Sequence, residues 1–319
     1  MNRRFALIQA LVSLVALAAV VWWATKQEAP EFPSGGEGIA WLVGAVVLYA
    51  AASLVRGERW HQILHLTGVH AHRSDCYALT CVGYMGNNVL PARAGEILRV
   101  VLLSNRCGAT KRTLLGSVVA ERLLDAVALA AIFVVVVYGV LSSTVLPTDR
   151  PLLFAGLILL GLLVVFACLY ALRSHHVFER ARDWLRPLAD APRALLSSWG
   201  LVLLAGTFVL WGFEAGVYLA VARAVDLDIS GMGALYLVAL TNFFAALPAA
   251  PGSIGTFDAA VIFGSKAIGA SGSAALSYLL TLRFILYVPI TAVGFLVLVT
   301  RYGGWARLRA AVRLEASRA

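Results

Sequence analysis

The organisation of this chain follows from one interrupted apolar stretch, CVGYMGNNVLPARAGEILRVVLL, which runs from Cys81 to Leu103. Two short apolar arms flank a turn that contains Pro91, Arg93 and Gly95. Proline lacks a backbone donor and disfavours helix at the residue before it, so the stretch does not fit one straight helix. Non-helical backbone at membrane depth persists only where protein or a watery cavity satisfies its polar groups. We therefore interpret Asp75 to Arg106 as a helical hairpin that dips into a membrane and lines a binding site.

A second stretch has the same plan. It reads LTNFFAALPAAPGSIGTFDAAVIFG from Leu240 to Gly264, and we expect a hairpin over Ile229 to Gly269. The residues expected to form the two hairpin turns are Pro91, Gly95, Pro248, Pro251, Gly252 and Gly255. The alternative is a pair of proline-kinked spans or interfacial loops, because proline and glycine are common in membrane helices.

The composition indicates an integral membrane protein. Of 319 residues, 61% are hydrophobic and 13% are charged, whereas soluble proteins average about 25% charged residues. A bilayer core takes about 20 helical residues to cross. Six predominantly apolar runs approach or exceed that length: Phe5 to Ala24, Ile39 to Val55, Leu114 to Leu141, Pro151 to Leu172, Trp199 to Ala222 and Ala274 to Thr300. The predicted fold is an all-α polytopic membrane protein with about six transmembrane helices and two re-entrant broken-helix hairpins.

The basic residues predict the topology, because arginine and lysine concentrate in cytoplasmic loops. With the N-terminus inside, the loop segments 56–112 and 173–193 and the C-terminal tail lie on the cytoplasmic face. The opposite face holds Lys26, Arg150, Arg223 and Lys266. Counting either hairpin as a single crossing would invert the later loops. We therefore expect both termini in the cytoplasm, and the net charge of +9 indicates topology and anionic headgroups, with no nucleic-acid partner.

A bacterial inner (plasma) membrane is the expected location, because only Lys26, Lys111 and Lys266 are lysines, a bias typical of high-GC bacterial genomes. The cysteines show no CxxC spacing, so a disulfide framework is not expected.

Two parts of the chain resemble each other. The tripeptides Leu90-Pro91-Ala92 and Leu247-Pro248-Ala249 are 157 positions apart, and Arg122 and Arg283 are 161 apart. Three spans separate equivalent points, so the halves would have opposite orientations, as in the inverted repeats of secondary transporters. The expected units are an anchor helix and outer loop (1–38), repeat 1 (39–145), a linking span with a cytoplasmic amphipathic segment (146–198), repeat 2 (199–301) and a basic tail (302–319).

Charges within apolar segments are costly and are functional candidates by default. On a helix, Glu121 and Asp125 share a face, and Arg122 reaches Asp125 at i+3 but needs a further partner. The candidate substrate-binding residues are Asn87, Asn88, Arg93, Glu96, Glu121, Arg122, Asp125, Glu214, Ser253, Thr256, Asp258 and Arg283.

These residues favour an anionic ligand. A helix begins after each turn, and its free N–H groups attract phosphate or carboxylate. Arg93 adds charge at the first turn, Ser253 and Thr256 add hydroxyls at the second, and Arg122 and Arg283 suit bidentate binding. Glu96 and Asp258 would orient the arginines or carry protons. The alternative reading, compatible with the first, is a set of internal ion pairs that hold the hairpins to the third and sixth spans.

Other chemistry is less favoured. His61 and His65 lie one helical turn apart, which permits a metal site, but an interfacial helix after the second span with Trp60 at headgroup level explains them better. We expect no metal and no cofactor. The sequence has no Walker A, HExxH or GxSxG motif, so ATP-driven pumping by this chain is not expected.

Three motifs carry a family resemblance: NNVLPARAGE from Asn87, ERLLD from Glu121 and LPAAPGSIGTFD from Leu247. Together they resemble the flippase-like lysylphosphatidylglycerol synthase transmembrane family, over roughly Ile39 to Thr300. That family includes the membrane half of the multiple peptide resistance factor, whose relatives flip aminoacylated phospholipids. The resemblance implies lipid transport without naming the lipid. The sequence ends at Ala319, soon after the last expected span, so we expect no synthase domain and no enzyme.

The leading hypothesis is a lipid translocator, flippase or scramblase-like, that moves a phospholipid or a polyprenyl or glyco-lipid with an anionic headgroup without ATP hydrolysis. A secondary transporter of a small anionic solute is one alternative. A scaffold that presents lipid to a partner enzyme is another. The expected partners are membrane lipids, and the sequence leaves open a homo-oligomer and a lipid-synthesis enzyme. An intramembrane enzyme is least favoured.

Overall fold

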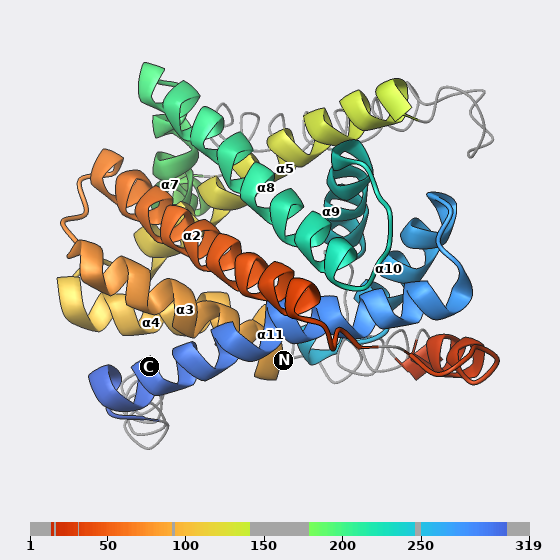
Figure 1. Ribbon diagram of the computed structural model, residues 1–319. Helices are drawn as coiled ribbons and strands as arrows, with labels where there is room; N and C mark the ends of the chain where they lie inside the picture. The colour runs from red at the N-terminus through yellow and green to blue at the C-terminus, as the bar shows by residue number, and fades with distance from the viewer. Residues whose placement is uncertain are drawn as a thin grey trace.

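The protein is all-helical in the computed structural model, which describes residues 14–15, 17–30, 32–90, 93–140, 179–245 and 250–304. Within these ranges every regular element is a helix (Figure 1). The helices are α2 (Gly36–Leu66), α3 (Arg73–Val89), α4 (Gly95–Cys107), α5 (Lys111–Val140), α7 (Glu179–Ala194), α8 (Ser198–Ala224), α9 (Gly231–Ala245), the 3₁₀ turn η3 (Pro251–Ser253), α10 (Thr256–Ala267) and α11 (Gly272–Tyr302).

Three helices of the described part are long and apolar enough to cross a membrane, namely α2, α8 and α11. They coincide with the expected spans that start at Ile39, Trp199 and Ala274. Large apolar side chains on them face outward, including Val47, Leu201 and Leu296. Such outward apolar surface fits a lipid environment. The chain is therefore a multi-pass membrane protein.

The other expected spans are described to different extents. The run Leu114 to Leu141 corresponds to α5, which also carries buried charges. Residues 17–24 are helical, within the run Phe5 to Ala24. The run Pro151 to Leu172 lies outside the described residues, as do the turn residues Pro91 and Pro248.

The end of the second span was predicted wrongly. The expected span stops at Val55 and gives way to an interfacial helix, but α2 continues without a break to Leu66. Trp60, expected at headgroup level, is fully buried. Gly57 is helical and packs against Tyr77, and the helix ends before Gly68, which takes the left-handed conformation (φ 74°) that commonly ends helices. Arg56 and Arg59 therefore lie on a buried helix face and are not loop charges.

The first broken stretch forms a true hairpin. Gly86 packs against Gly95, and Gly83, three residues earlier, packs against Arg99, so α4 runs back along α3. A Cβ atom on Gly95 would lie 1.9 Å from the Gly83 carbonyl oxygen, so only glycine allows this approach. A proline-kinked single span would not place these residues together, and that alternative is wrong for this stretch.

The second broken stretch folds the same way. Gly264 of α10 packs against Leu237 and Leu240 of α9, and Ile268 approaches Gly233. The two helices are therefore antiparallel, with η3 between them. We call α3 with α4 the first hairpin and α9 with α10 the second hairpin.

The contacts between helices occur in two matching sets. Within α2 to α5, consecutive helices pack together and the first also packs on the last, and α8 to α11 repeat this pattern. Across the sets α2 packs on α8, while α3 packs on α11 and α5 packs on α9. Figure 1 shows α2 and α8 side by side, and α3 packs on both α4 and α11. Reciprocal contacts of this kind are what a two-fold relation produces. The inverted repeat and its boundaries remain a prediction.

Candidate functional site

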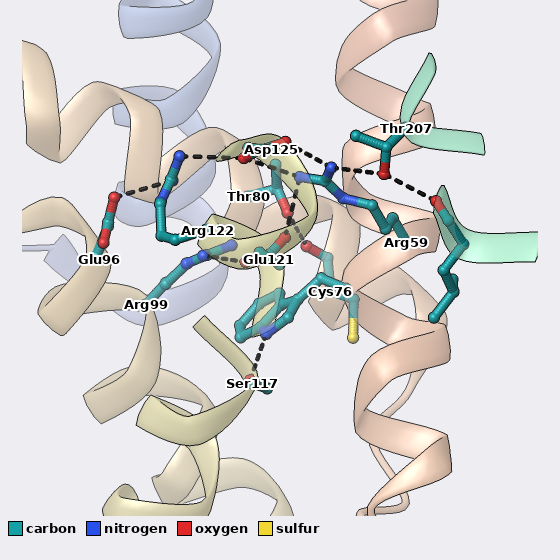
Figure 2. A network of polar contacts seen from close by, with 12 residues as sticks. Arg59, Cys76, Thr80, Glu96, Arg99, Ser117, Glu121, Arg122, Asp125 and Thr207 are labelled. Carbon is teal, nitrogen blue, oxygen red and sulfur yellow. Dashed lines mark hydrogen bonds and ion pairs between the residues drawn. The ribbon is translucent and has the colours of Figure 1, made fainter. Parts of the chain in front are cut away.

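Four arginines from three helices converge on a small buried cavity. We call Arg56 and Arg59 of α2, Arg99 of α4 and Arg122 of α5 the arginine cluster. The cavity measures about 10 Å³, close to the least volume that holds one water molecule. The remaining lining residues are Thr80, Gly83, Tyr84, Asn87, Glu96 and Glu121. Figure 2 shows the polar contacts that link these helices.

Asp125 and Glu121, one turn apart on α5, share the arginines of the cluster. Arg59 donates to both carboxylate oxygens of Asp125, at 2.6 and 3.3 Å, and to the Thr207 hydroxyl of α8 at 3.1 Å. Arg122 donates to Asp125 at 3.2 Å, as the i, i+3 spacing predicts. Glu121 forms an ion pair with Arg99 and lies 3.9 Å from Arg59. The two carboxylates therefore connect α5 to α2 and α4.

Glu96 supplies the further partner that Arg122 needs. Its carboxylate lies 2.9 Å from Arg122 and 3.8 Å from Arg93. Glu96 lies in the first turn of α4, so the ion pair joins the first hairpin to α5. Arg93 has a left-handed backbone (φ 53°) and a half-exposed side chain at the edge of the site.

Aromatic rings enclose two of the arginines. The Arg56 guanidinium pairs with Glu214 of α8 and lies 5.3 Å from the centre of the Tyr84 ring and 6.0 Å from that of Trp211. Arg99 lies 4.4 Å from the Trp60 ring, whose Nε1 donates to the Ser117 hydroxyl at 2.9 Å. Planar guanidinium groups stack well on such rings, which stabilises the charges away from water.

The charged side chains of the described site carry one more positive than negative charge, which favours binding of an anion. Five arginines of the described site, the cluster and Arg93, face four carboxylates: Glu96, Glu121, Asp125 and Glu214. Each arginine of the cluster also has a buried nitrogen without a hydrogen-bond partner among the described residues: Nη1 of Arg56 and Nε of Arg59, Arg99 and Arg122. Unpaired buried donors are costly, so an added acceptor would stabilise them.

A second, smaller charged group lies at the second hairpin. Arg283 of α11 pairs with Asp258 of α10, with Nη2 3.0 Å from Oδ2, and also donates to the Gly252 carbonyl at 3.3 Å. Asp258 accepts from the Gly255 N–H at 2.8 Å, so a protein carboxylate already occupies the start of α10. The Thr256 hydroxyl donates to the Ser253 carbonyl at 3.3 Å.

The tips of the two hairpins meet. Asn88, next to the end of α3, donates from Nδ2 to the Thr291 hydroxyl of α11 at 2.9 Å. A Cβ atom on Gly252 would lie 3.5 Å from the Asn88 carbonyl oxygen and 3.2 Å from the Tyr287 ring. The turn of the second hairpin therefore packs directly against the end of α3.

The candidates chosen from sequence fall into groups. The cavity region holds Asn87, Glu96, Glu121, Arg122 and Asp125, with Arg93 at its edge. The second hairpin holds Ser253, Thr256, Asp258 and Arg283, while Asn88 lies at the contact between the tips and Glu214 pairs with Arg56.

Sequence reasoning missed Arg56, Arg59 and Arg99, which it counted as cytoplasmic loop charges. All three are buried, each about 5% exposed. The signal that would have found the first two is their i, i+3 spacing, which places both on one face if the helix continues past Gly57. At the metal site considered from sequence, around His61 and His65, the His65 and His70 rings contact each other. The described residues contain no group of three metal-binding side chains.

Helical spans, paired broken helices and a buried charged site together define a polytopic membrane protein whose polar centre is enclosed by helices. The chain belongs to the lysylphosphatidylglycerol synthase transmembrane family, because the family model described as "Lysylphosphatidylglycerol synthase TM region" matches residues 7–294. This agrees with the resemblance seen in the three sequence motifs, and it relates the chain to lipid handling. Among curated proteins, none matches the chain.

Proposed function

We propose that this protein translocates a lipid with an anionic headgroup across a bacterial inner membrane, without ATP hydrolysis and without catalysing a reaction. The observation that carries the proposal is the arginine cluster, in which each of the four guanidinium groups has a buried nitrogen without a hydrogen-bond partner among the described residues. The family match adds the lipid context. We further propose that both termini are cytoplasmic, on the charge pattern of the loops.

Phosphate is the group that best fits the cluster. Guanidinium groups bind phosphate oxygens bidentately, and four of them lie around one cavity. The single excess positive charge of the site matches the single charge of a phosphodiester headgroup. A neutral headgroup would leave that excess uncompensated in an apolar setting, which is unfavourable.

Entry of a headgroup requires the Glu96–Arg122 contact to open. A cavity of about 10 Å³ is far too small for a phosphate, so the described conformation is closed around the site. Arg122 is the most exposed arginine of the cluster, and its partner Glu96 belongs to the hairpin. An incoming phosphate would replace Glu96 on Arg122, while Asp125 continues to orient the guanidinium. The lipid tails would stay in hydrocarbon throughout.

The test is leaflet exchange of fluorescent phospholipids and polyprenyl phosphates in proteoliposomes, with and without a proton gradient. We expect exchange by the wild type, a loss of at least about tenfold in Arg122→Ala, and a smaller loss in Glu96→Gln. Arg223→Ala is the matched control, because Arg223 is an exposed arginine that pairs with exposed Asp228 away from the cluster.

The outcomes separate the proposal from its rivals. If the folded wild type binds these lipids but exchanges none, the protein is a lipid-presenting scaffold and the proposal is wrong. If it instead takes up a small anionic solute in the same vesicles, it is a solute transporter. Equal exchange in the wild type and Arg122→Ala would show that the cluster does not serve transport.

A further inference from the structure

An apolar groove lies on the surface between helical residues 17–24 and α10. It has a volume of about 520 Å³, within the range of small-molecule sites. Val20 and Trp23 line one wall, and Ala259, Ile262, Phe263 and Lys266 line the other. The α10 residues follow the spacing i, i+3, i+4 and i+7, so they form one continuous face of the helix. Phe263 is 57% exposed, so this face is open to its surroundings.

One end of the groove is cationic and aromatic. The Lys266 Nζ lies 5.6 Å from the centre of the Trp23 ring, and the Lys26 Nζ lies 3.8 Å from that of Trp22. The described part of the chain provides no carboxylate within salt-bridge distance of either lysine. Tryptophan and lysine together mark the headgroup level of a membrane, where the ring stays in the apolar layer and the amine reaches the phosphates.

The other end of the groove reaches the charged tip of the second hairpin. Ala259 lies in the groove wall and directly follows Asp258, the partner of Arg283. The distance from Ala259 to Lys266 along α10 is about 10 Å at 1.5 Å per residue. The groove is therefore an apolar channel along the membrane-facing side of α10, with a cation only at its outer end.

We infer that this groove binds one tail of an anionic phospholipid, whose phosphate contacts Lys266. The charge decides the occupant, because a groove lined by one lysine and no acidic side chain complements a phosphate and not a neutral lipid. The apolar wall matches a hydrocarbon tail, and the open side faces the bilayer. The inference concerns a binding site apart from the arginine cluster, and it holds whether or not the protein translocates lipid.

The experiment uses the full chain in nanodiscs with phosphatidylglycerol that carries a photoactivatable group in its tail. Cross-linked peptides are mapped by mass spectrometry. We expect labelling to concentrate on residues 17–27 and 256–267, above the level on the outward face of α8. Lys266→Ala should weaken the labelling about fivefold, the loss expected for one basic residue at a headgroup. Lys266→Arg should restore it, and Arg223→Ala should leave it unchanged.

Two further arms make the result decisive. A neutral diacylglycerol with the same tail should label the groove equally in the wild type and Lys266→Ala, because it has no phosphate. Ala259→Trp should fill the inner end of the groove and reduce labelling by both probes. Even labelling over all outward apolar faces, or no response to Lys266→Ala in protein shown to be folded, would overturn the inference. Loss of lipid exchange with intact groove labelling would instead count against the proposed translocation alone.

Discussion

At the scale of single residues, the buried arginines determine how the helices are joined. Arg59 alone contacts Asp125 and Glu121 of α5 and Thr207 of α8. A guanidinium group has five donors in one plane, so a single side chain can connect three helices. Removing such a residue leaves buried carboxylates without a partner, which is costly in a low-dielectric interior. The arginines of the site therefore support the fold as well as the proposed anion binding.

The Arg56–Glu214 pair gives a prediction on stability. Arg56→Met or Glu214→Leu alone should destabilise the protein by about 3–5 kcal/mol, because each leaves one buried charge unpaired. The double variant should lose much less than the sum, since both charges are gone. Thermal unfolding of the purified variants in the same detergent measures the effect. Asp228→Ala, which removes an exposed partner of Arg223, should change stability by less than about 1 kcal/mol. Additive losses in the double variant would contradict the prediction.

At the scale of elements, the close contact of α3 and α4 depends on three glycines. Gly83, Gly86 and Gly95 let the two helices approach until their backbones touch. Small residues at helix contacts are the common device for close packing in membranes, where hydrophobic association is weak. The first hairpin places both Glu96 and Arg99 in the site, so its packing positions the charges.

Gly95→Ala is therefore expected to disrupt the first hairpin. Its added methyl group would lie 1.9 Å from the Gly83 carbonyl oxygen and 2.5 Å from the Asn87 nitrogen. Gly44→Ala is the matched control, because the same methyl group on α2 meets nothing within 4 Å. We expect Gly95→Ala to lower the melting temperature and lipid exchange, and Gly44→Ala to be neutral or to stabilise by about 0.5–1 kcal/mol. Equal melting temperatures for the two variants would show that the helices separate at little cost.

Sequence patterns predicted the elements better than the site. Hydropathy located α2, α8 and α11, and the Pro and Gly turns located both hairpins. The end of α2 was missed because Arg56 and Arg59 were taken as loop charges, and hydropathy does not distinguish an arginine in water from one paired inside a protein. Arg99 was missed for the same reason. Their partners, Glu214, Asp125 and Glu121, lie 158, 66 and 22 residues away, and one sequence does not specify contacts of that kind.

At the scale of the whole molecule, both ends of α3 are joined to α11. Near the tips, Asn88 donates to Thr291. At the opposite end of α3, Asp75 accepts from Tyr302 at 2.8 Å and pairs with Arg301 at 2.9 Å. The reciprocal contact of α5 with α9 is apolar, with the Phe133 and Phe243 rings packed edge to face. The α3–α11 contact is therefore polar and charged, whereas the reciprocal α5–α9 contact is apolar.

A cross-link between the end of α3 and α11 tests whether the first hairpin moves away from α11 during transport. In a background without the four native cysteines, we would introduce Asn88→Cys and Thr291→Cys and bridge them with a short bifunctional thiol reagent. Because the closed cavity admits no headgroup, bridging should stop leaflet exchange, and cleavage of the bridge by reductant should restore it. Each single-cysteine variant treated with the same reagent is the control. Full exchange in bridged protein would mean that the lipid passes without the first hairpin moving away from α11.

Under the predicted inverted repeat, the Arg56–Glu214 pair lies at nearly equivalent positions of the two halves. The two residues are 158 positions apart, close to the offset of the predicted repeat, and they join α2 to its counterpart α8. In an assembly of two identical halves, this position would meet its own copy, and two buried arginines or two buried glutamates would repel. Under the predicted repeat, opposite charges there require two halves whose sequences differ at this position. Neither half would then pair stably with a copy of itself. Both halves would need to stay in one chain for the protein to fold.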